Sequence, residues 1–393
     1  MIDFLTETEA MRDQLVAWRR DFHMHPELKY EERRTAAIVA AHLEALGYCV
    51  QTGVARTGVV GLLEGAAPGP VVMLRFDMDA LPVTEETGAP YASRTPGCMH
   101  ACGHDGHVAI GMGLAQLLAG LRLDIAGSVK LIFQPAEEGG NGAALMVQEG
   151  VLEAPRPDVF LSAHIWTDAP VGTVNVTPGP VMAAADTFTC TVRGRGGHGA
   201  LPHQSVDPVV AAAHVVTALQ TIVSRNVSPL DTAVVTVGAI HGGDAFNVIP
   251  PTVELRGTIR TYQPHTRTMI HRRMQETVDG VAAGCGAAAD LEIVPLTPAV
   301  INDPEVTQVV MRAAESILGA DRVHSGERTM GSEDAAFFLN EIPGCYFFLG
   351  GANPEKHLGA PHHNPRFDFD EDVLPLGVRV LARASATYLM QSD

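Results

Sequence analysis

Residues 100–107 concentrate side chains that can bind a metal ion. The sequence HACGHDGH holds three histidines, one cysteine and one aspartate in eight positions. Thiolate and imidazole suit Zn²⁺, Mn²⁺, Ni²⁺ and similar ions, which makes Cys102 and His104 candidate ligands. The other ligands must come from distant parts of the chain, so this is not a zinc finger. Taken alone, the segment also allows a polar helix entry with surface histidines.

Two adjacent carboxylates, Glu137 and Glu138, form a second candidate group. Adjacent acids usually mark a solvated turn, but these follow an apolar segment and a proline and precede two glycines. Glycine lets a backbone and a metal approach closely. One carboxylate can bind metal while its neighbour acts as a base on activated water, and a pair of metals would strengthen that chemistry.

Short apolar runs must position these groups. Runs at 59–63, 71–76, 128–133 and 158–163 are typical of strands buried on both faces, and residues 30–46 and 104–119 are predicted helices. This alternation predicts an α/β domain with a mixed sheet covered by helices. The strands at 71–76, 128–133 and 158–163 run directly into Asp77, Gln134 and His164. Ligands bind at the carboxyl ends of such strands, so we expect a site at that edge.

The middle of the chain predicts a separate small domain. Strands at 187–192, 233–240, 252–261 and 289–295 alternate with helices at 208–224 and 266–283 in β-α-β-β-α-β order, which is ferredoxin-like. Asp207 and Pro208 are predicted to start the first of these helices. Helices at 304–318, 334–340 and from Val373, with a strand at 345–349, return to α/β character. We therefore predict a discontinuous catalytic domain, 1–180 and 297–393, with an inserted α+β domain at 181–296.

Composition excludes several functional classes. In the 393 residues, 27 Lys and Arg against 45 Asp and Glu give a net charge of −18 without a basic cluster, so nucleic acid and anionic membranes are poor partners. No run of 18 apolar residues appears, and the first 12 residues do not resemble a signal peptide. Six scattered cysteines do not form a disulfide scaffold. We expect a reduced, cytoplasmic protein.

Two other catalytic interpretations have less support. GRGGHG at 194–199 matches the dinucleotide-binding pattern, but no helix follows it directly and no acid stands about 20 residues later. The chain lacks the G-x-S-x-G elbow of serine hydrolases. Cys102 could act as a nucleophile, but its neighbours fit metal binding at least as well.

Six motifs together resemble the dinuclear metallo-amidohydrolases. They are DMDALP at 77–82, MHACGHDGH at 99–107, QPAEEGG at 134–140, GHGA at 197–200, FNVIP at 246–250 and MGSED at 330–334. The resemblance is closest to the branch of hippurate hydrolases, N-acyl-amino-acid amidohydrolases and plant auxin-conjugate hydrolases. It covers nearly the whole chain.

The resemblance implies a site with two divalent ions, Zn²⁺, Mn²⁺, Ni²⁺ or Co²⁺. The implied ligands are Cys102, His104, Glu138, His164 and a C-terminal histidine, for which the His-x-Pro pattern selects His363 over His362. Glu137 matches the general base. Asp77 stands where the wider clan has a histidine ligand, with Cys102 compensating, and Asp79 is implied to orient the site.

The resemblance also implies groups that reach the substrate. His198 and Asn247, on the inserted lid and dimerisation domain, match residues that in related enzymes act across a dimer interface, so a homodimer or dimer-based oligomer is expected. Arg260, Gly331 and Ser332 are candidates for the substrate carboxylate. Whether His198 acts on its own subunit's site or its partner's stays open.

The function predicted from these residues is hydrolysis of hippurate-like N-acyl-L-amino acids to a carboxylate and a free amino acid. The alternatives are a metallo-exopeptidase acting on dipeptides and a catalytically silent, metal-dependent binding protein. The intact Glu137 argues against the silent protein. The acyl group and the native metal stay open.

Overall fold

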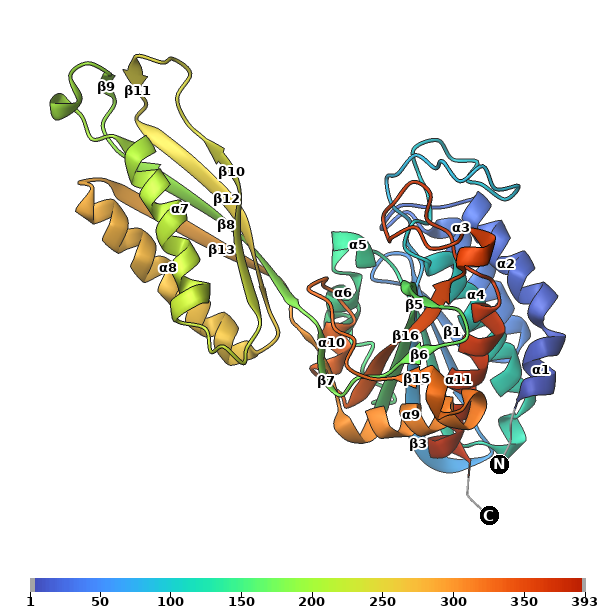
Figure 1. Ribbon diagram of the computed structural model, residues 1–393. Coiled ribbons are helices and arrows are strands. Elements are labelled where there is room, and N and C mark those ends of the chain that lie inside the picture. The colour runs from blue at the N-terminus through green and yellow to red at the C-terminus, as the bar shows by residue number, and fades with distance from the viewer. Residues whose placement is uncertain (1–3, 391–393) are drawn as a thin grey trace. The chain divides into compact units, whose positions relative to one another are not determined.

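The computed structural model describes residues 4–390, which form two compact units (Figure 1). Unit 1 contains the residues up to Val181, Ile301–Arg328 and those from Asp334 on. Unit 2 contains Met182–Val300 and Thr329–Glu333. Residues 1–3 and 391–393, the two ends of the predicted catalytic domain, lie outside the described residues.

Unit 1 is built on a large mixed sheet with helices packed against it. Its helices are α1 (Leu5–Ala10), α2 (Arg12–Met24), α3 (Arg33–Ala45), α4 (His104–Gly120), α5 (Glu137–Gly140), α6 (Gly142–Gln148), α9 (Pro304–Leu318), α10 (Ala336–Leu339) and α11 (Val373–Leu389). Its sheet strands are β1 (Cys49–Val54), β2 (Gly58–Glu64), β3 (Ala67–Asp77), β4 (Ala126–Gln134), β5 (Val159–Pro170), β6 (Val174–Asn175), β15 (Val323–His324) and β16 (Gly344–Ala352).

The strand order in this sheet is β1-β2-β4-β3-β5-β16-β6-β15. The central strands β4, β3, β5 and β16 are parallel, whereas β1, β2 and β6 introduce antiparallel pairs. Asp77 and Gln134, the last residues of β3 and β4, are register partners. The prediction of an α/β fold with a mixed sheet is therefore confirmed.

Helix α4 lies close against the sheet and thereby places its first turn at the carboxyl ends of the strands. It packs on β3, β4 and β5 and on the helices α2, α3 and α11. Nearly all of its residues are buried. A Cβ at Gly111 would come within 2.6 Å of the Phe76 ring, so only glycine allows this approach.

Three predicted elements differ from the structure. The helix predicted at 30–46 begins at Arg33, because Tyr30 has a φ of 63°, which is outside the helical region. The strand predicted to end at 163 continues through His164 to Pro170, since β16 pairs with it as far as Trp166 and again at Pro170. The helix predicted at 334–340 is reduced to the single turn α10, because so short a segment gains little from helix propagation.

Unit 2 has the strand order of the split βαβ pattern. Its sheet is β10 (Ala233–His241), β12 (Thr252–Thr261), β8 (Ala184–Arg193) and β13 (Ala288–Thr297), all antiparallel. The helices α7 (Pro208–Arg225) and α8 (Pro264–Gly284) pack on each other and on this sheet. Asp207 caps α7 as predicted, because its side chain accepts the N–H of Val209 at 2.8 Å. Unit 2 also contains a two-stranded ladder of β9 (Gly197–His198) and β11 (Val248–Ile249). A second short pair, β7 (Gly179–Met182) with β14 (Val300–Asn302), lies where the chain passes from one unit to the other. The role of unit 2 as a lid and dimerisation domain stays a prediction.

No helix within residues 4–390 is both long and apolar enough to cross a lipid bilayer.

A buried ion network fixes the start of α4. Arg19, from α2, is fully buried and donates from Nε to Asp105 Oδ2 at 2.9 Å and from Nη2 to Asp368 Oδ1 at 2.6 Å. Asp105 is the second residue of α4, and Asp368 belongs to the segment that leads into α11. One guanidinium therefore joins three distant parts of the chain.

We expect Arg19→Met to lower the free energy of unfolding by about 3–5 kcal/mol, because it leaves Asp105 and Asp368 buried without their cation. Arg20→Met is the matched control. Arg20 pairs with Glu371 but its side chain is 43% exposed, so its loss should cost about 1 kcal/mol or less. Urea unfolding measures both values, and equal losses would contradict the anchoring role of Arg19.

Candidate metal centre

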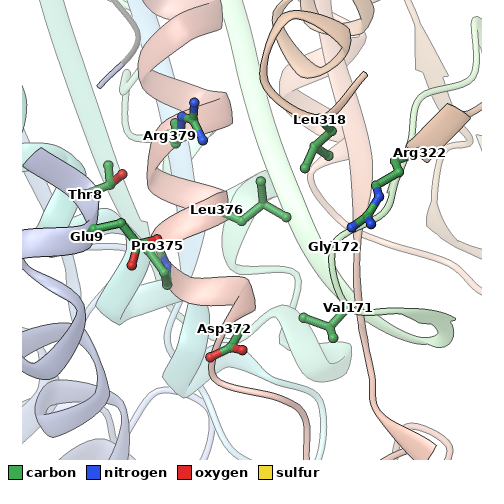
Figure 2. Close-up of a pocket in the computed structure, with 10 residues that line it drawn as sticks. All are labelled: Thr8, Glu9, Val171, Gly172, Leu318, Arg322, Asp372, Pro375, Leu376 and Arg379. Atoms are coloured by element: carbon green, nitrogen blue, oxygen red, sulfur yellow. The ribbon is translucent and has the colours of Figure 1, made fainter. Parts of the chain in front are cut away.

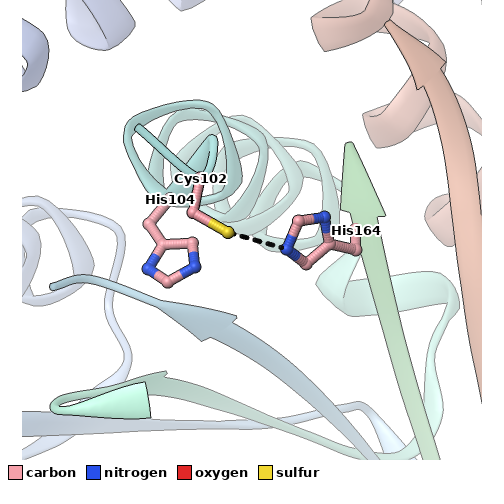
Figure 3. Close-up of side chains that lie close together, drawn as sticks. All are labelled: Cys102, His104 and His164. Atoms are coloured by element: carbon pink, nitrogen blue, oxygen red, sulfur yellow. Dashed lines mark hydrogen bonds between the residues drawn. The ribbon is translucent and has the colours of Figure 1, made fainter. Parts of the chain in front are cut away.

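The cysteine and the first histidine of the centre come from the junction between a loop and α4. Gly103, at the N-cap, has a φ of 92°, which favours glycine. Cys102 precedes it and His104 is the first helical residue, so both side chains lie at one end of α4. The Cys102 Sγ atom is 3.6 Å from Nε2 of His164, which comes from β5 (Figure 3).

The hydrogen bonds of both histidines leave Nε2 as the available nitrogen. His104 donates from Nδ1 to the backbone carbonyl of Asp79 at 2.8 Å, and His164 donates from Nδ1 to the carbonyl of Ile165 at 2.7 Å. A carbonyl only accepts, so the proton is on Nδ1 and Nε2 can offer a lone pair to a metal. Nε2 of His104 is buried and has no hydrogen-bond partner among the described residues. A buried ring nitrogen without a hydrogen-bond partner fits the position of a metal ligand.

The two adjacent carboxylates lie on a short turn after β4. Asp79 accepts the N–H of Glu137 at 3.0 Å with one oxygen and the N–H of Glu138 at 2.9 Å with the other. Both oxygens of Asp79 are thus used to hold the turn. Oε1 of Glu138 lies 3.2 Å from Nε2 of His363.

The two adjacent histidines near the C-terminus, His362 and His363, make different contacts. His362 donates from Nε2 to the carbonyl of Ile165 at 3.0 Å and is half-buried. His363 has a φ of 66° and donates its backbone N–H to the carbonyl of Ala101 at 2.8 Å. The side chain of His363 therefore lies beside Glu138, whereas that of His362 supports the strand β5.

The five predicted ligands gather in two overlapping groups. The donor atoms of Cys102, His104 and His164 lie within 4.8 Å of one another, and so do those of Cys102, Glu138 and His363. Cys102 belongs to both. Sulfur, imidazole and carboxylate at such separations fit one or two transition-metal ions. Glu137 lies within the same distance of His104 and Glu138.

The electrostatics of the centre favour a cation. Burial lowers the pKa of His104, but Asp77 and Asp79 reverse this effect and bring it to about 10. Burial and the carboxylates of Glu138 and Glu137 raise the pKa of Cys102 well above its usual range. Protons on these two groups thus offset the negative charge of the site, and a metal ion that binds here would displace them.

Asp77 and His107 form a supporting pair rather than a pair of ligands. His107 Nδ1 lies 2.5 Å from Asp77 Oδ1, and His107 Nε2 accepts the N–H of Ile165 at 2.9 Å. Both ring nitrogens are therefore used. Arg75 donates from Nη1 to Asp77 Oδ2 at 2.8 Å. Sequence reasoning did not single out Arg75, although a charged residue inside an apolar strand was the signal that could have found it.

The remaining predicted residues lie in unit 2. His198 and Asn247 are exposed and lie at one end of the β9–β11 ladder, where the N–H of Gly199 donates to the carbonyl of Asn247 at 2.8 Å. Arg260 is in β12 and is half-buried. Gly331 and Ser332 belong to the returning segment, where the Gly331 carbonyl accepts the N–H of Ala183 at 2.8 Å. His198 and Asn247 are thus brought together, whereas Arg260 lies on a different strand.

A separate cavity of about 310 Å³ lies in unit 1 (Figure 2). It contains residues of both charges but none of the predicted site residues, so it is not the metal centre. Its lining consists of Thr8, Glu9, Val171, Gly172, Leu318, Arg322, Asp372, Pro375, Leu376 and Arg379.

Comparisons with known proteins point to one family. Residues 73–387 match the family described as Peptidase family M20/M25/M40. An N-acetylcysteine deacetylase of Bacillus subtilis is 38% identical over 382 residues, covering 97% of this chain and 98% of the relative. The IAA-amino acid hydrolase ILR1-like 4 of Arabidopsis thaliana is 38% identical over 383 residues, covering 96% and 86%. The solved YXEP protein of Bacillus subtilis, described as a dinuclear metal binding peptidase from the M20 family, has a TM-score of 0.86 at 34% identity and covers 97% and 99% of the two chains.

Replacing Cys102 by serine should reduce metal binding, because a hydroxyl is a far poorer ligand than a thiolate and Cys102 belongs to both donor groups. Metal content after dialysis against Zn²⁺ or Mn²⁺ measures the effect. Cys98→Ser is the matched control, because Cys98 is also buried but contacts the carbonyl of Pro26 instead. Full metal content in Cys102→Ser would contradict the assignment.

Proposed function

The chain belongs to the Peptidase family M20/M25/M40, and we propose that it is a metal-dependent amidohydrolase that cleaves N-acyl-L-amino acids to a carboxylate and a free amino acid. The observation that carries this proposal is Glu137, a carboxylate held beside a group of metal-binding side chains. A hydrolase of this kind needs such a base next to its activated water.

We propose that Cys102, His104, Glu138, His164 and His363 would hold two divalent ions, and Cys102 belongs to both groups of donor atoms. Bound ions would polarise the substrate carbonyl and make water acidic enough to attack it. Zn²⁺, Mn²⁺, Ni²⁺ and Co²⁺ all accept this mixture of ligands. Cys102 can bind a metal ion only while it is reduced. The six cysteines form no disulfide, which suits a cytoplasmic enzyme.

Glu137 is the proposed general base and then general acid. It takes a proton from the attacking water and returns it to the leaving amine nitrogen, so that one water and one amide give an acid and an amine. Asp79 supports this role because it holds the N–H groups of Glu137 and Glu138 at 3.0 and 2.9 Å. His198 would stabilise the developing oxyanion.

Residues of unit 2 are proposed to recognise the amino-acid part of the substrate. Asn247 directly precedes β11, whose Val248 pairs with His198. Arg260, Gly331 and Ser332 are the candidates for its carboxylate. This assignment, and the expected homodimer or dimer-based oligomer, rest on the resemblance of the motifs around these residues.

The names of the relatives support an amide substrate with an amino-acid half. One is a deacetylase of N-acetylcysteine and another is a hydrolase of IAA-amino acids. A hippurate-like substrate is the finer proposal. A metallo-exopeptidase acting on dipeptides is the second candidate, favoured by the description of the YXEP protein as a peptidase. A silent metal-dependent binding protein would give no turnover at all.

A panel of N-acetyl, N-benzoyl and indole-acetyl amino acids, with dipeptides beside them, tests the proposal in the presence of each metal. We expect release of free amino acid from an N-acyl substrate, lost with chelator and restored by metal.

Glu137→Gln should lower kcat by about 10²–10⁴-fold with metal retained, because the amide is not a base. Glu138→Gln should lower metal content instead. Exchanged phenotypes would reverse the two roles, and turnover of dipeptides alone would favour the exopeptidase.

Action of His198 in the partner's site can be tested with mixed dimers. Glu137→Gln and His198→Ala should each be nearly inactive as homodimers. In a mixed dimer, the chain that keeps Glu137 receives His198 from its partner, so one site is complete. Random exchange makes half the dimers mixed with one good site each, so activity should return to about a quarter of the wild-type value. No recovery, with mixed dimers shown to form, would contradict action across the interface.

A further inference from the structure

The turn that carries Glu137 and Glu138 has a backbone conformation that other contacts must maintain. Ala136, just before it, has a φ of 56° and a ψ of 42°, a left-handed conformation that is unfavourable for an L-residue with a Cβ. Gly139 and Asn141 have φ values of 69° and 54°. A left-handed alanine persists only where the surrounding structure fixes it.

Three consecutive N–H groups of this turn donate to buried carboxylates. Those of Glu137 and Glu138 donate to Asp79, and that of Ala136 donates to Oε1 of Glu32 at 2.9 Å. Successive N–H groups in a left-handed turn form a concavity that attracts anions, and here the anions are side chains of the protein. Glu32 stands 104 residues before Ala136 in the chain and is fully buried.

Glu32 is free to reach the turn because another residue caps its helix. It occupies the N-cap position of α3, where a side chain normally accepts the first N–H groups. Those of Arg34 and Thr35 donate to the Glu27 carboxylate instead, each at 2.8 Å. The second oxygen of Glu32 accepts the hydroxyl of Thr57 at 2.5 Å. These contacts fix Glu32 with Oε1 toward the turn.

We propose that Glu32 is a positioning residue for the hydrolysis: by holding the N–H of Ala136 it fixes the left-handed turn, and with it the directions of Glu137 and Glu138. The inference rests on the proposed function, because Glu32 acts only through these two carboxylates. A buried carboxylate is costly to desolvate, so an apolar side chain here would be favoured if only packing mattered.

Glu32→Ala tests the proposal in the full-length protein. Loss of outer contacts of this kind typically costs 10–100-fold in metal affinity or activity, and we expect a loss of about that size in Zn²⁺ affinity or in kcat at saturating metal. Calorimetric titration of the metal-free protein gives the affinity independently of turnover. Asp303→Ala is the control, since Asp303 accepts at 2.9 Å the N–H of Glu305 at the start of α9, a helix that carries no site residue. Its metal affinity and kcat should stay at the wild-type values.

Glu32→Gln separates positioning from the presence of a charge. The N–H of Ala136 can only donate, so the glutamine oxygen must face it, and the amide NH₂ then faces Thr57, whose hydroxyl can accept. We therefore expect Glu32→Gln to restore metal affinity and kcat. Should Glu32→Ala fail to fold, Glu32→Asp keeps the charge but shortens the reach by one methylene, and it should show the same loss.

Wild-type metal affinity and kcat in Glu32→Ala or Glu32→Asp would overturn the proposal, as would a Glu32→Gln protein as impaired as Glu32→Ala. These outcomes are distinct from failure of the proposed function. That failure would appear as no turnover of any N-acyl amino acid by the wild-type protein, or as full activity of Glu137→Gln.

Discussion

Unit 1 must keep several carboxylates out of water at one edge of its sheet, and much of its architecture follows from that constraint. Asp77, Asp79, Asp105 and Glu32 are buried, and the side chain of Glu138 is only 13% exposed. An isolated ionised carboxylate in a low-dielectric interior is very unfavourable. Each of these groups has a specific compensating partner, and the type of partner differs with its task.

The partners divide into fixed cations, backbone N–H groups and groups that a metal can replace. Arg75 neutralises Asp77, and Arg19 neutralises Asp105. Asp79 and Glu32 instead accept backbone N–H groups, which stabilise a carboxylate without adding a second charge. Glu138 lies beside His363, whose pKa it raises. Glu138 thus has a titratable histidine as its partner and lies where a cation can bind.

The same division explains how much of the molecule could be predicted from its sequence. The strands at 71–76 and 128–133 and the helix at 104–119 were predictable, because apolar runs and helical periodicity are local properties. The ligand candidates could be listed because cysteine, histidine and paired acids are rare in such spacing. The role of Glu32 was not predictable, since it depends on a contact between residues 104 positions apart and on Glu27 taking over the cap of α3. The continuation of β5 past His164 likewise depends on pairing with β16, a strand almost 200 residues later in the chain.

The two units are under different physical constraints. In unit 1, the groups around the centre are buried and share hydrogen-bond partners, so a change at one of them leaves another buried group unsatisfied. In unit 2, His198, Phe246 and Asn247 are exposed on a short two-stranded ladder and its loop, and Phe246 makes no contribution to a core. Exposed loop side chains can change with little effect on stability. Metal binding therefore depends on contacts that the fold of unit 1 cannot easily lose, whereas residues near His198 can vary while that centre stays intact.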